Sequence, residues 1–272
     1  MTPNATALAR FGLANPILTD QSKIATIWKV ERKGQPAALK LYHDGDTKDE
    51  WPGFAFLASR KGNGAVEVYD AHDGMAVMEW LDGPSLGDMS RTGDDDEAST
   101  ILGTTAAALH AVNTDCDLPL LTDRIDALLQ FRSQAECPQN TREVMHAAQT
   151  LAHSLIENQR DIRPLHGDLH HDNIRQGTRG HVAFDAKGLI GDPAYDLANA
   201  FLNPMDAPAT VGCQARMIRM AAIMADTTGI SAKRLLDWAA VHCALTIAWE
   251  NAPVPDASLL TTMMAAREVS PR

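Results

Sequence analysis

The segment HGDLHHDN, which runs from His166 to Asn173, constrains the fold of this chain more than any other. Asp168 precedes Asn173 by five residues, and a second carboxylate, Asp185, follows in the run HVAFDAKG. The interval between Asn173 and Asp185 has the length of a β-hairpin, with NIRQ and VAFDA as its two strands. The segment therefore predicts a hairpin that presents a polar oxygen ligand at the free end of each strand.

Asp168, Asn173 and Asp185 together indicate one type of reaction. A base, an amide oxygen and a second carboxylate in this order are typical of phosphoryl-transfer sites, where positioning and charge neutralisation supply most of the catalysis. Asp168 is the candidate base that takes or orients a hydroxyl proton. Asn173 and Asp185 are the candidate metal ligands, because hard oxygen atoms suit Mg²⁺. Each residue alone could instead be a turn former, but their joint spacing indicates a phosphotransferase.

Composition excludes several other classes of protein. The 272 residues carry a net charge of −11, which opposes the basic surface that a nucleic-acid-binding protein needs. No run reaches the about 18 uninterrupted apolar residues of a membrane span, and the N-terminus has no signal-peptide pattern. The four cysteines are scattered without a CxxC pair, as expected of reduced thiols. We expect a cytoplasmic protein with neither nucleic acid nor membrane as its partner.

The negative charge is concentrated in the later part of the chain. Residues 1–80 carry a net charge of −1, whereas residues 81–272 carry −10. A surface this acidic attracts a cationic small-molecule substrate, although acidic surfaces also serve solubility alone. The sequence leaves both explanations open.

The order of local patterns predicts an α+β chain with two lobes. Short β-rich runs at 24–31 and 37–42, and two more before residue 81, predict a four- or five-stranded antiparallel sheet with one helix. Apolar residues at three- and four-residue steps predict helices from about residue 96 onward. We place the division in the turn-rich segment 81–88, which gives a β-rich nucleotide-binding lobe over 1–80 and a helical lobe over 81–272. The cleft between such lobes is the expected ligand site.

In the first lobe, Lys40 is the candidate phosphate-binding residue, because it stands in a strand pattern with apolar neighbours. Glu50 begins the only early helix and is the expected partner of Lys40, with Asp49 as a competitor. The alternative for Lys40 is an ordinary exposed strand lysine.

Other nucleotide contacts are expected at the two ends of the predicted sheet. The segment 18–28 should cover the phosphates through Ser22 and neighbouring backbone N–H groups, yet it contains no glycine and is not a P-loop. Backbone groups of Glu79 to Leu81 are expected at an adenine edge, with Met78 behind them, although a run of this kind is also typical of core.

His166, His170 and His171 raise the alternative of a zinc hydrolase, but their spacing does not form a recognised zinc motif. We expect His166 to pack beneath the loop and to hydrogen-bond its backbone. The acids Asp192 and Asp196 suit a helix N-terminus and are expected to support the structure.

With these residues in place, the chain resembles the aminoglycoside/hydroxyurea antibiotic resistance kinases, a family that includes streptomycin 6-phosphotransferases. The run from Asp185 to Asp196 matches the family's hallmark except at Ala186, where the family has proline, which leaves the loop less rigid. Segment 239–251 is similar to the family's penultimate helix. The resemblance is close over 165–205 and loose in the first lobe.

The resemblance implies a eukaryotic-protein-kinase-like fold, ATP and Mg²⁺ as cofactors, and phosphorylation of a hydroxyl on a small molecule. It assigns the base to Asp168, the metal to Asn173 and Asp185, and the phosphates to Lys40. It also implies a role for Lys187 in neutralising charge that develops on the γ-phosphate.

Three functions remain open at this stage. The first is a kinase for streptomycin, another aminoglycoside or hydroxyurea, with Asp206, Trp249 and Glu250 as candidate acceptor-pocket residues. The second is a housekeeping kinase for a sugar, an amino alcohol or a fructosamine-like metabolite. The third is a silent kinase-like binding module, which would be expected to lack one of the four residues at the centre of the site. The oligomeric state and the choice between ATP and GTP stay open.

Overall fold

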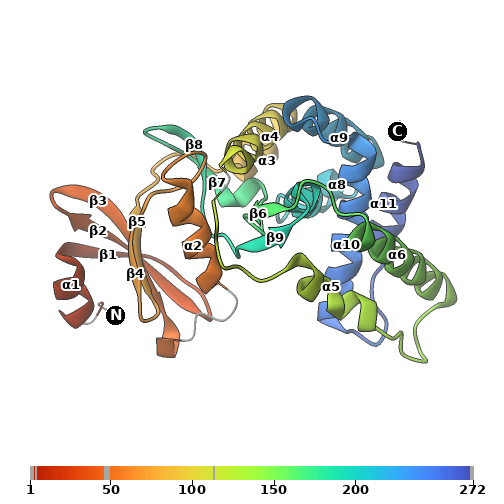
Figure 1. Ribbon diagram of the computed structural model, residues 1–272, viewed down its shortest axis with the longest axis horizontal. Helices are drawn as coiled ribbons and strands as arrows, with labels where there is room; N and C mark the ends of the chain where they lie inside the picture. Colours follow the sequence, from red (N-terminus) through yellow and green to blue (C-terminus); the bar gives the residue numbers. More distant parts are fainter. Residues whose placement is uncertain (1–2, 4, 46–49, 113, 270–272) are drawn as a thin grey trace.

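A five-stranded antiparallel sheet forms the N-terminal lobe of the protein, with strand order β1-β2-β3-β5-β4 (Figure 1). The computed structural model describes all residues except 1–2, 4, 46–49, 113 and 270–272. Asp49, the competitor expected for Glu50, lies outside the described residues. The elements of this lobe are α1 (Ala5–Phe11), β1 (Leu13–Gln21), β2 (Ala25–Arg32), β3 (Gln35–Tyr42), a 3-10 turn (His43–Gly45), α2 (Trp51–Arg60), β4 (Val68–His72) and β5 (Met75–Glu79).

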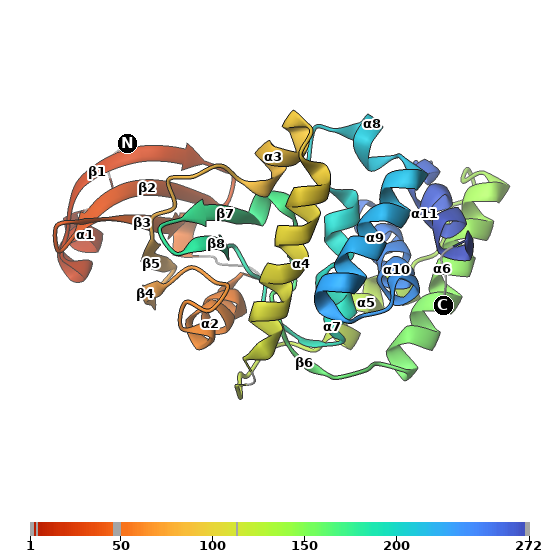
Figure 2. The same cartoon turned by 90° about the horizontal axis from the view of Figure 1, so that it is seen from above.

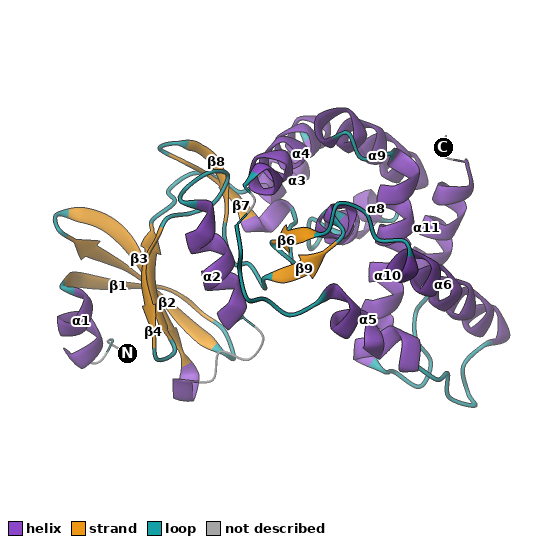
Figure 3. Cartoon of the chain, viewed as in Figure 1, coloured by secondary structure: helices purple, strands orange, loops and turns teal. Residues whose placement is uncertain are grey.

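The two faces of the sheet bury different side chains because residues alternate along a strand. Trp28 and Leu39 are paired across β2 and β3, and they belong to a small apolar cluster that packs against Leu8 and Phe11 of α1. The opposite face of β3 carries Ala38 and is covered by α2, which lies between the sheet and the second lobe (Figures 1 and 3). Lys40 lies two residues after Ala38 on β3, so its side chain points to the same face of the sheet, toward α2.

Helices make up most of the second lobe, and α10 is the most deeply buried of them. This lobe contains α3 (Leu86–Thr92), α4 (Asp95–Ala111), α5 (Leu121–Gln130), α6 (Gln139–Glu157), β6 (Arg163–Leu165), η2 (His171–Asn173), β7 (Ile174–Gly177), β8 (Gly180–Ala183), β9 (Leu189–Gly191), α7 (Pro193–Asp196), η3 (Ala198–Leu202), α8 (Pro208–Val211), α9 (Gln214–Thr228), α10 (Ala232–Glu250) and α11 (Ser258–Val269). None of the described helices is both long and apolar enough to cross a membrane.

The predicted hairpin is confirmed as β7–β8, and it joins the two lobes (Figures 1 and 2). The N–H of Val66, just before β4, donates to the carbonyl of Ala183 at 2.9 Å. The N–H of Gly83 donates to the carbonyl of Gln176 on the other strand at 3.0 Å. The hairpin is therefore fixed to the N-terminal lobe by backbone bonds, and its position relative to the sheet is defined.

Two segments differ from the sequence prediction. The expected segment 18–28 is a strand–turn–strand rather than one loop, because β1 runs to Gln21 and β2 begins at Ala25. A tight turn joins them, closed by the Ser22 N–H, which donates to the carbonyl of Ala25 at 2.9 Å. The second difference is α3, a helix that begins inside the expected crossing 81–88 and has a capping box between Ser85 and Asp88.

Candidate active site

The loop that carries Asp168 is held by a buried carboxylate. Asp196, at the end of α7, accepts hydrogen bonds from the backbone N–H groups of His166 and Gly167 at 3.0 and 2.7 Å. His110 contacts the same carboxylate at 2.9 Å. Burial alone would raise the pKa of Asp196, but these hydrogen bonds outweigh it and lower that pKa. An ionised anchor thus fixes the backbone immediately before Asp168.

His166 connects this loop to the loop that carries Asp185. Its Nδ1 accepts from the N–H of Asp168 at 3.3 Å, so its Nε2 carries the proton and donates to the carbonyl of Phe184 at 3.0 Å. The expectation that His166 packs beneath the loop and bonds its backbone is confirmed. This bonding also argues against a zinc hydrolase. Among the residues that the structure describes, no group of three His, Cys, Asp or Glu side chains could hold a metal ion.

Two asparagines position Asp168. The side-chain amide of Asn199, on η3, donates to Asp168 Oδ1 at 2.6 Å. The side-chain amide of Asn173 donates to the backbone carbonyl of Asp168 at 2.9 Å. One carboxylate oxygen is therefore engaged by Asn199, and the orientation of the carboxylate is fixed before any substrate arrives.

Asn173 and Asp185 lie on adjacent strand ends, as the hairpin prediction requires. The N–H of Phe184 donates to the carbonyl of Asn173 at 3.0 Å, which places Asp185 one residue further along. Asp185 adopts a left-handed backbone conformation with φ 62°, and its side chain is 40% exposed. The donor set fits Mg²⁺: an exposed carboxylate lies beside an asparagine whose amide nitrogen is already engaged, so its oxygen would be the ligand atom.

Lys40 and Glu50 form the expected ion pair beneath the sheet. Lys40 Nζ lies 2.6 Å from Glu50 Oε2 and also 2.6 Å from Asp185 Oδ1. The Tyr42 hydroxyl donates to Glu50 Oε2 at 2.5 Å. Burial alone would raise the pKa of Glu50, but the bonds from Lys40 and Tyr42 lower it to about 2. Burial alone would lower the pKa of Lys40, but the charge of Asp185 raises it above its usual value.

The second lobe contributes a further cation to Glu50. Lys187 Nζ lies 3.0 Å from Glu50 Oε1, so each oxygen of this carboxylate contacts a lysine. The contact is possible because α2 packs directly on the loop that contains Lys187. A Cβ atom at Gly53 would lie 1.7 Å from the carbonyl oxygen of Ala186, and one at Gly188 would lie 2.6 Å from that of Pro52. Both positions therefore require glycine.

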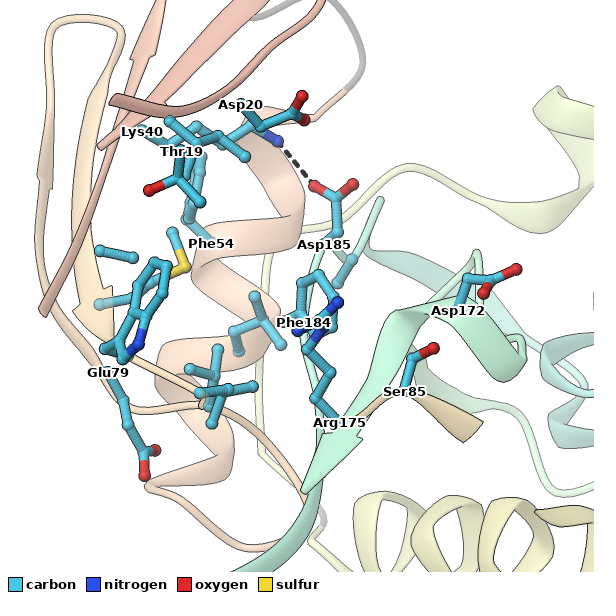
Figure 4. Close-up of a pocket in the computed structure, with 18 of the residues that line it drawn as sticks. Thr19, Asp20, Lys40, Phe54, Glu79, Ser85, Asp172, Arg175, Phe184 and Asp185 are labelled. Atoms are coloured by element: carbon cyan, nitrogen blue, oxygen red, sulfur yellow. Dashed lines mark hydrogen bonds and ion pairs between the residues drawn. The ribbon is translucent and has the colours of Figure 1, made fainter. Parts of the chain in front are cut away.

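A pocket of about 480 Å³ extends from Lys40 and Asp185 between the two lobes (Figure 4). Its lining combines apolar side chains with charged ones such as Lys40, Arg175 and Asp185. The apolar lining consists of Ile27, Ala38, Phe54, Leu57, Val66, Met78, Trp80, Leu81, Phe184 and Ala186. In Figure 4, Lys40 reaches from the sheet toward Asp185, and the dashed line marks their ion pair. The shape suits a flat apolar base at one end and charged groups at the other.

Of the nucleotide contacts that we expected from the sequence, three residues line this pocket and Ser22 does not. Met78, Glu79 and Leu81 all line it. The N–H of Glu79 is bonded to the carbonyl of Glu67 and its side chain to Arg179, so neither group is available to a nucleotide. Ser22 is not among the lining residues.

The hydroxyl of Ser22 accepts from the N–H of Ala25 at 3.1 Å and thereby stabilises its own turn. Thr19 and Asp20 of β1 line the pocket instead.

A second pocket of about 560 Å³ lies beside Lys187 and includes Trp249. Of the acceptor candidates expected from the sequence, Trp249 thus lines a pocket, whereas Asp206 and Glu250 line neither of the two pockets.

The fold and the site define a small-molecule kinase of the protein-kinase-like class, an ATP-dependent phosphotransferase with an alcohol group as acceptor. The chain belongs to the aminoglycoside/hydroxyurea antibiotic resistance kinase family, which it matches over residues 10–253.

Individual relatives agree with this family. The chain is 35% identical over 231 residues to a streptomycin 3''-kinase of Klebsiella pneumoniae, covering 82% of this chain and 83% of that protein. It is 28% identical over 193 residues to a streptomycin 6-kinase of Streptomyces griseus, covering 68% of this chain and 61% of that protein. The fold is similar to that of aminoglycoside phosphotransferase APH(4)-Ia in complex with ADP and hygromycin B, with a TM-score of 0.61, 13% identity and 96% of each chain covered.

Three residues at the site were not predicted from the sequence, namely Tyr42, Gly53 and Asn199, whereas Thr19 and Asp20 lie within the expected segment 18–28. Of these, Tyr42 had a readable signal, since it stands two residues after Lys40 and therefore on the same face of the strand. The others depend on packing between segments that are distant in the chain.

Proposed function

We propose that this enzyme transfers the γ-phosphoryl group of ATP, with Mg²⁺, to a hydroxyl of streptomycin or a closely related aminoglycoside. The observation that carries the reaction is a continuous chain of short contacts. Asp168 is bonded to Asn173, the strand end of Asn173 is bonded to the residue before Asp185, and Asp185 is paired with Lys40, which is paired with Glu50. The identity to a streptomycin 3''-kinase supports the acceptor class.

Each residue has a defined part in this reaction. Asp168 accepts the proton of the attacking hydroxyl as its oxygen bonds to the γ-phosphorus and ADP departs. Lys40 binds the α- and β-phosphates, and Glu50 holds Lys40 in place. Asn173 and Asp185 would hold Mg²⁺, which neutralises phosphate charge when bound. Lys187 lies near enough to Glu50 and to the loop of Asp185 to stabilise negative charge that develops during transfer.

The remaining assignments belong to the same proposal. Residues 1–80 form the nucleotide-binding lobe and residues 81–272 carry the catalytic loop and the acceptor site. Met78 and Leu81 contact the adenine, and Thr19, which lines the pocket, is better placed than Ser22 to approach the phosphates. The use of ATP as the donor supports a cytoplasmic location. The net charge of −10 on residues 81–272 favours a cationic acceptor.

The test is ADP release from Mg-ATP with purified protein in the presence of streptomycin, other aminoglycosides, hydroxyurea, sugars or amino alcohols. Asp168→Asn is the control, and we expect it to lower kcat by at least about a hundredfold while ATP binding is retained. Mass spectrometry and NMR of the product identify the phosphorylated hydroxyl. Turnover only with a sugar or an amino alcohol would replace the proposed acceptor by a metabolite.

A further inference from the structure

A buried ion pair joins α4 to α9, two helices that lie side by side in the second lobe (Figures 1 and 2). The Nε and Nη2 atoms of Arg216 each lie 2.8 Å from an oxygen of the Asp95 carboxylate, and Arg216 is only 2% exposed. The Ser90 hydroxyl donates to the same carboxylate at 2.5 Å. Burial alone would raise the pKa of Asp95, but the hydrogen bonds from Arg216 and Ser90 lower it. The pair is therefore charged although it is largely removed from water.

Hydrogen bonds continue from this ion pair to Asp168. Arg216 Nη2 donates to the backbone carbonyl of Asn203, the residue that follows η3, at 3.0 Å. The side-chain amide of Asn203 donates to the backbone carbonyl of Asn199 at 2.9 Å and to Asn199 Oδ1 at 3.1 Å. Asn199 in turn donates to Asp168 Oδ1 at 2.6 Å. A continuous chain of bonds therefore runs from Asp95 to Asp168.

The bond from Asn203 decides which way the amide of Asn199 points. An asparagine amide accepts through its oxygen and donates through its nitrogen, and the two atoms exchange places when the amide rotates by half a turn. Because Asn199 Oδ1 accepts from Asn203, the nitrogen of the same amide faces Asp168. In the reversed orientation the amide oxygen would face the carboxylate, and two acceptors without a proton between them repel each other.

We infer that Arg216 is a positioning residue for the reaction: it holds the backbone of Asn203, and thereby keeps Asn199 donating to the Asp168 carboxylate. The inference rests on the proposed function, in which Asp168 is the base. Arg216 lies on α9 and lines neither of the two pockets. It therefore acts through Asn203 and Asn199 and not on a substrate.

Holding α4 to α9 does not by itself require this pair. The two helices pack closely further along, where a Cβ atom at Gly103 would lie 2.0 Å from the hydroxyl oxygen of Thr227. A second ion pair, between Arg219 Nε and Asp96 Oδ1 at 2.6 Å, joins the same helices at the surface. Burying an ion pair costs desolvation energy that the attraction often does not recover. The buried pair is therefore better explained by the position that it gives Asn203 than by stability alone.

Steady-state kinetics with Mg-ATP and streptomycin test the inference. Arg216→Lys keeps a positive charge beside Asp95 but lacks the planar fork that reaches both this carboxylate and the Asn203 carbonyl. We expect its kcat to fall about tenfold with the KM for ATP unchanged, because only the orientation of Asp168 is affected. Arg219→Lys is the matched control, since it makes the same change in the exposed pair between the same helices and should leave kcat unchanged.

A double variant separates positioning from a general loss of structure. If Arg216 acts through Asn199, Arg216→Lys should lower kcat little further in an enzyme that already carries Asn199→Ala. If loss of the ion pair merely loosened the fold, the two effects on kcat would be independent and would multiply. Asn203→Ala removes the amide that bonds Asn199, so it should lower kcat in the same way and show the same dependence on Asn199. It decides the question by the same criteria if Arg216→Lys does not fold.

A lowered kcat that is absent from Arg219→Lys and disappears in the Asn199→Ala background supports the inference. An unchanged kcat in folded Arg216→Lys, or an effect that multiplies with that of Asn199→Ala, overturns it and leaves the proposed function intact. An Asp168→Asn variant as active as wild type overturns the proposed role of Asp168 and this inference with it. A wild-type protein that phosphorylates no acceptor has the same consequence.

Discussion

Gly53 of α2 packs so closely on Ala186 that a Cβ atom at Gly53 would lie 1.7 Å from the Ala186 carbonyl oxygen. Gly53 is buried inside a helix, where alanine is normally preferred over glycine by about 1 kcal/mol. This contact brings the helix that begins after Glu50 onto the loop that follows Asp185. It therefore couples Lys40 of one lobe to the loop that carries Asp185 in the other.

Gly53→Ala tests this coupling. We expect the variant to lose about 1–3 kcal/mol in free energy of unfolding, against the helix preference, because α2 must move away from Ala186. Its kcat/KM should fall at least about tenfold, since the Lys40–Glu50–Asp185 contacts depend on the same approach. Urea denaturation and ADP-release assays measure both effects. Ala55→Gly, at an exposed position of the same helix, should lower stability slightly and leave the kinetics unchanged. A more stable and fully active Gly53→Ala would contradict the argument.

Glu50 contributes to the free energy of unfolding, and this contribution is lost at acid pH. Its folded-state pKa of about 2 lies below its ordinary value of 4.5. The unfolded state therefore binds the proton more readily, and the contribution of Glu50 is complete above pH 4.5 and is lost as the pH falls toward 2. We expect Glu50→Gln to be less stable than wild type at pH 7, with the difference shrinking across that range. Urea denaturation at several pH values measures it; a difference that grows as the pH falls would refute the proposed ion pairing.

Asn199 is expected to set the orientation of Asp168 through its 2.6 Å hydrogen bond. In Asn199→Ala the carboxylate is free to rotate, so we expect kcat to fall about 10- to 100-fold while the KM for ATP stays the same. Thermal unfolding serves as the control for folding, because Asn199 also bonds Asn203. An unchanged kcat would show that the Asp168 carboxylate is held by other groups.

The part of the site that could be predicted from the sequence is the part that is local in the chain. Asp168, Asn173 and Asp185 lie on one hairpin and its preceding loop, so their spacing alone brings them together. Lys40 and Glu50 are separated by a strand end and a helix start, which the hydrophobic pattern also indicates. In each case a short segment with regular geometry determines the distance.

The rest depends on contacts between distant segments. Asn199 is 31 residues from Asp168 and reaches it only because η3 packs beside the loop that carries Asp168. Thr19 and Asp20 line the pocket and Ser22 does not, because β1 ends at Gln21 and Ser22 closes the turn that follows. Helix α3 is a different case, because the Ser85–Asp88 capping box was present in the sequence and indicates a helix start.

We expect the carboxylate of Asp185 to determine how much Mg²⁺ the enzyme requires. Its carboxylate is paired with Lys40 at 2.6 Å and is 40% exposed, so it remains accessible to a cation. We expect Asp185→Asn to raise the Mg²⁺ concentration for half-maximal activity at least about tenfold, because a neutral amide is a weaker ligand for this ion. Removal of Mg²⁺ with EDTA should abolish ADP release from the wild-type protein, and added Mg²⁺ should restore it. Asn173→Ala is expected to shift the Mg²⁺ requirement in the same direction, since the two ligands lie on adjacent strand ends. A Mg²⁺ dependence that is identical in wild type and both variants would place the metal elsewhere in the cleft.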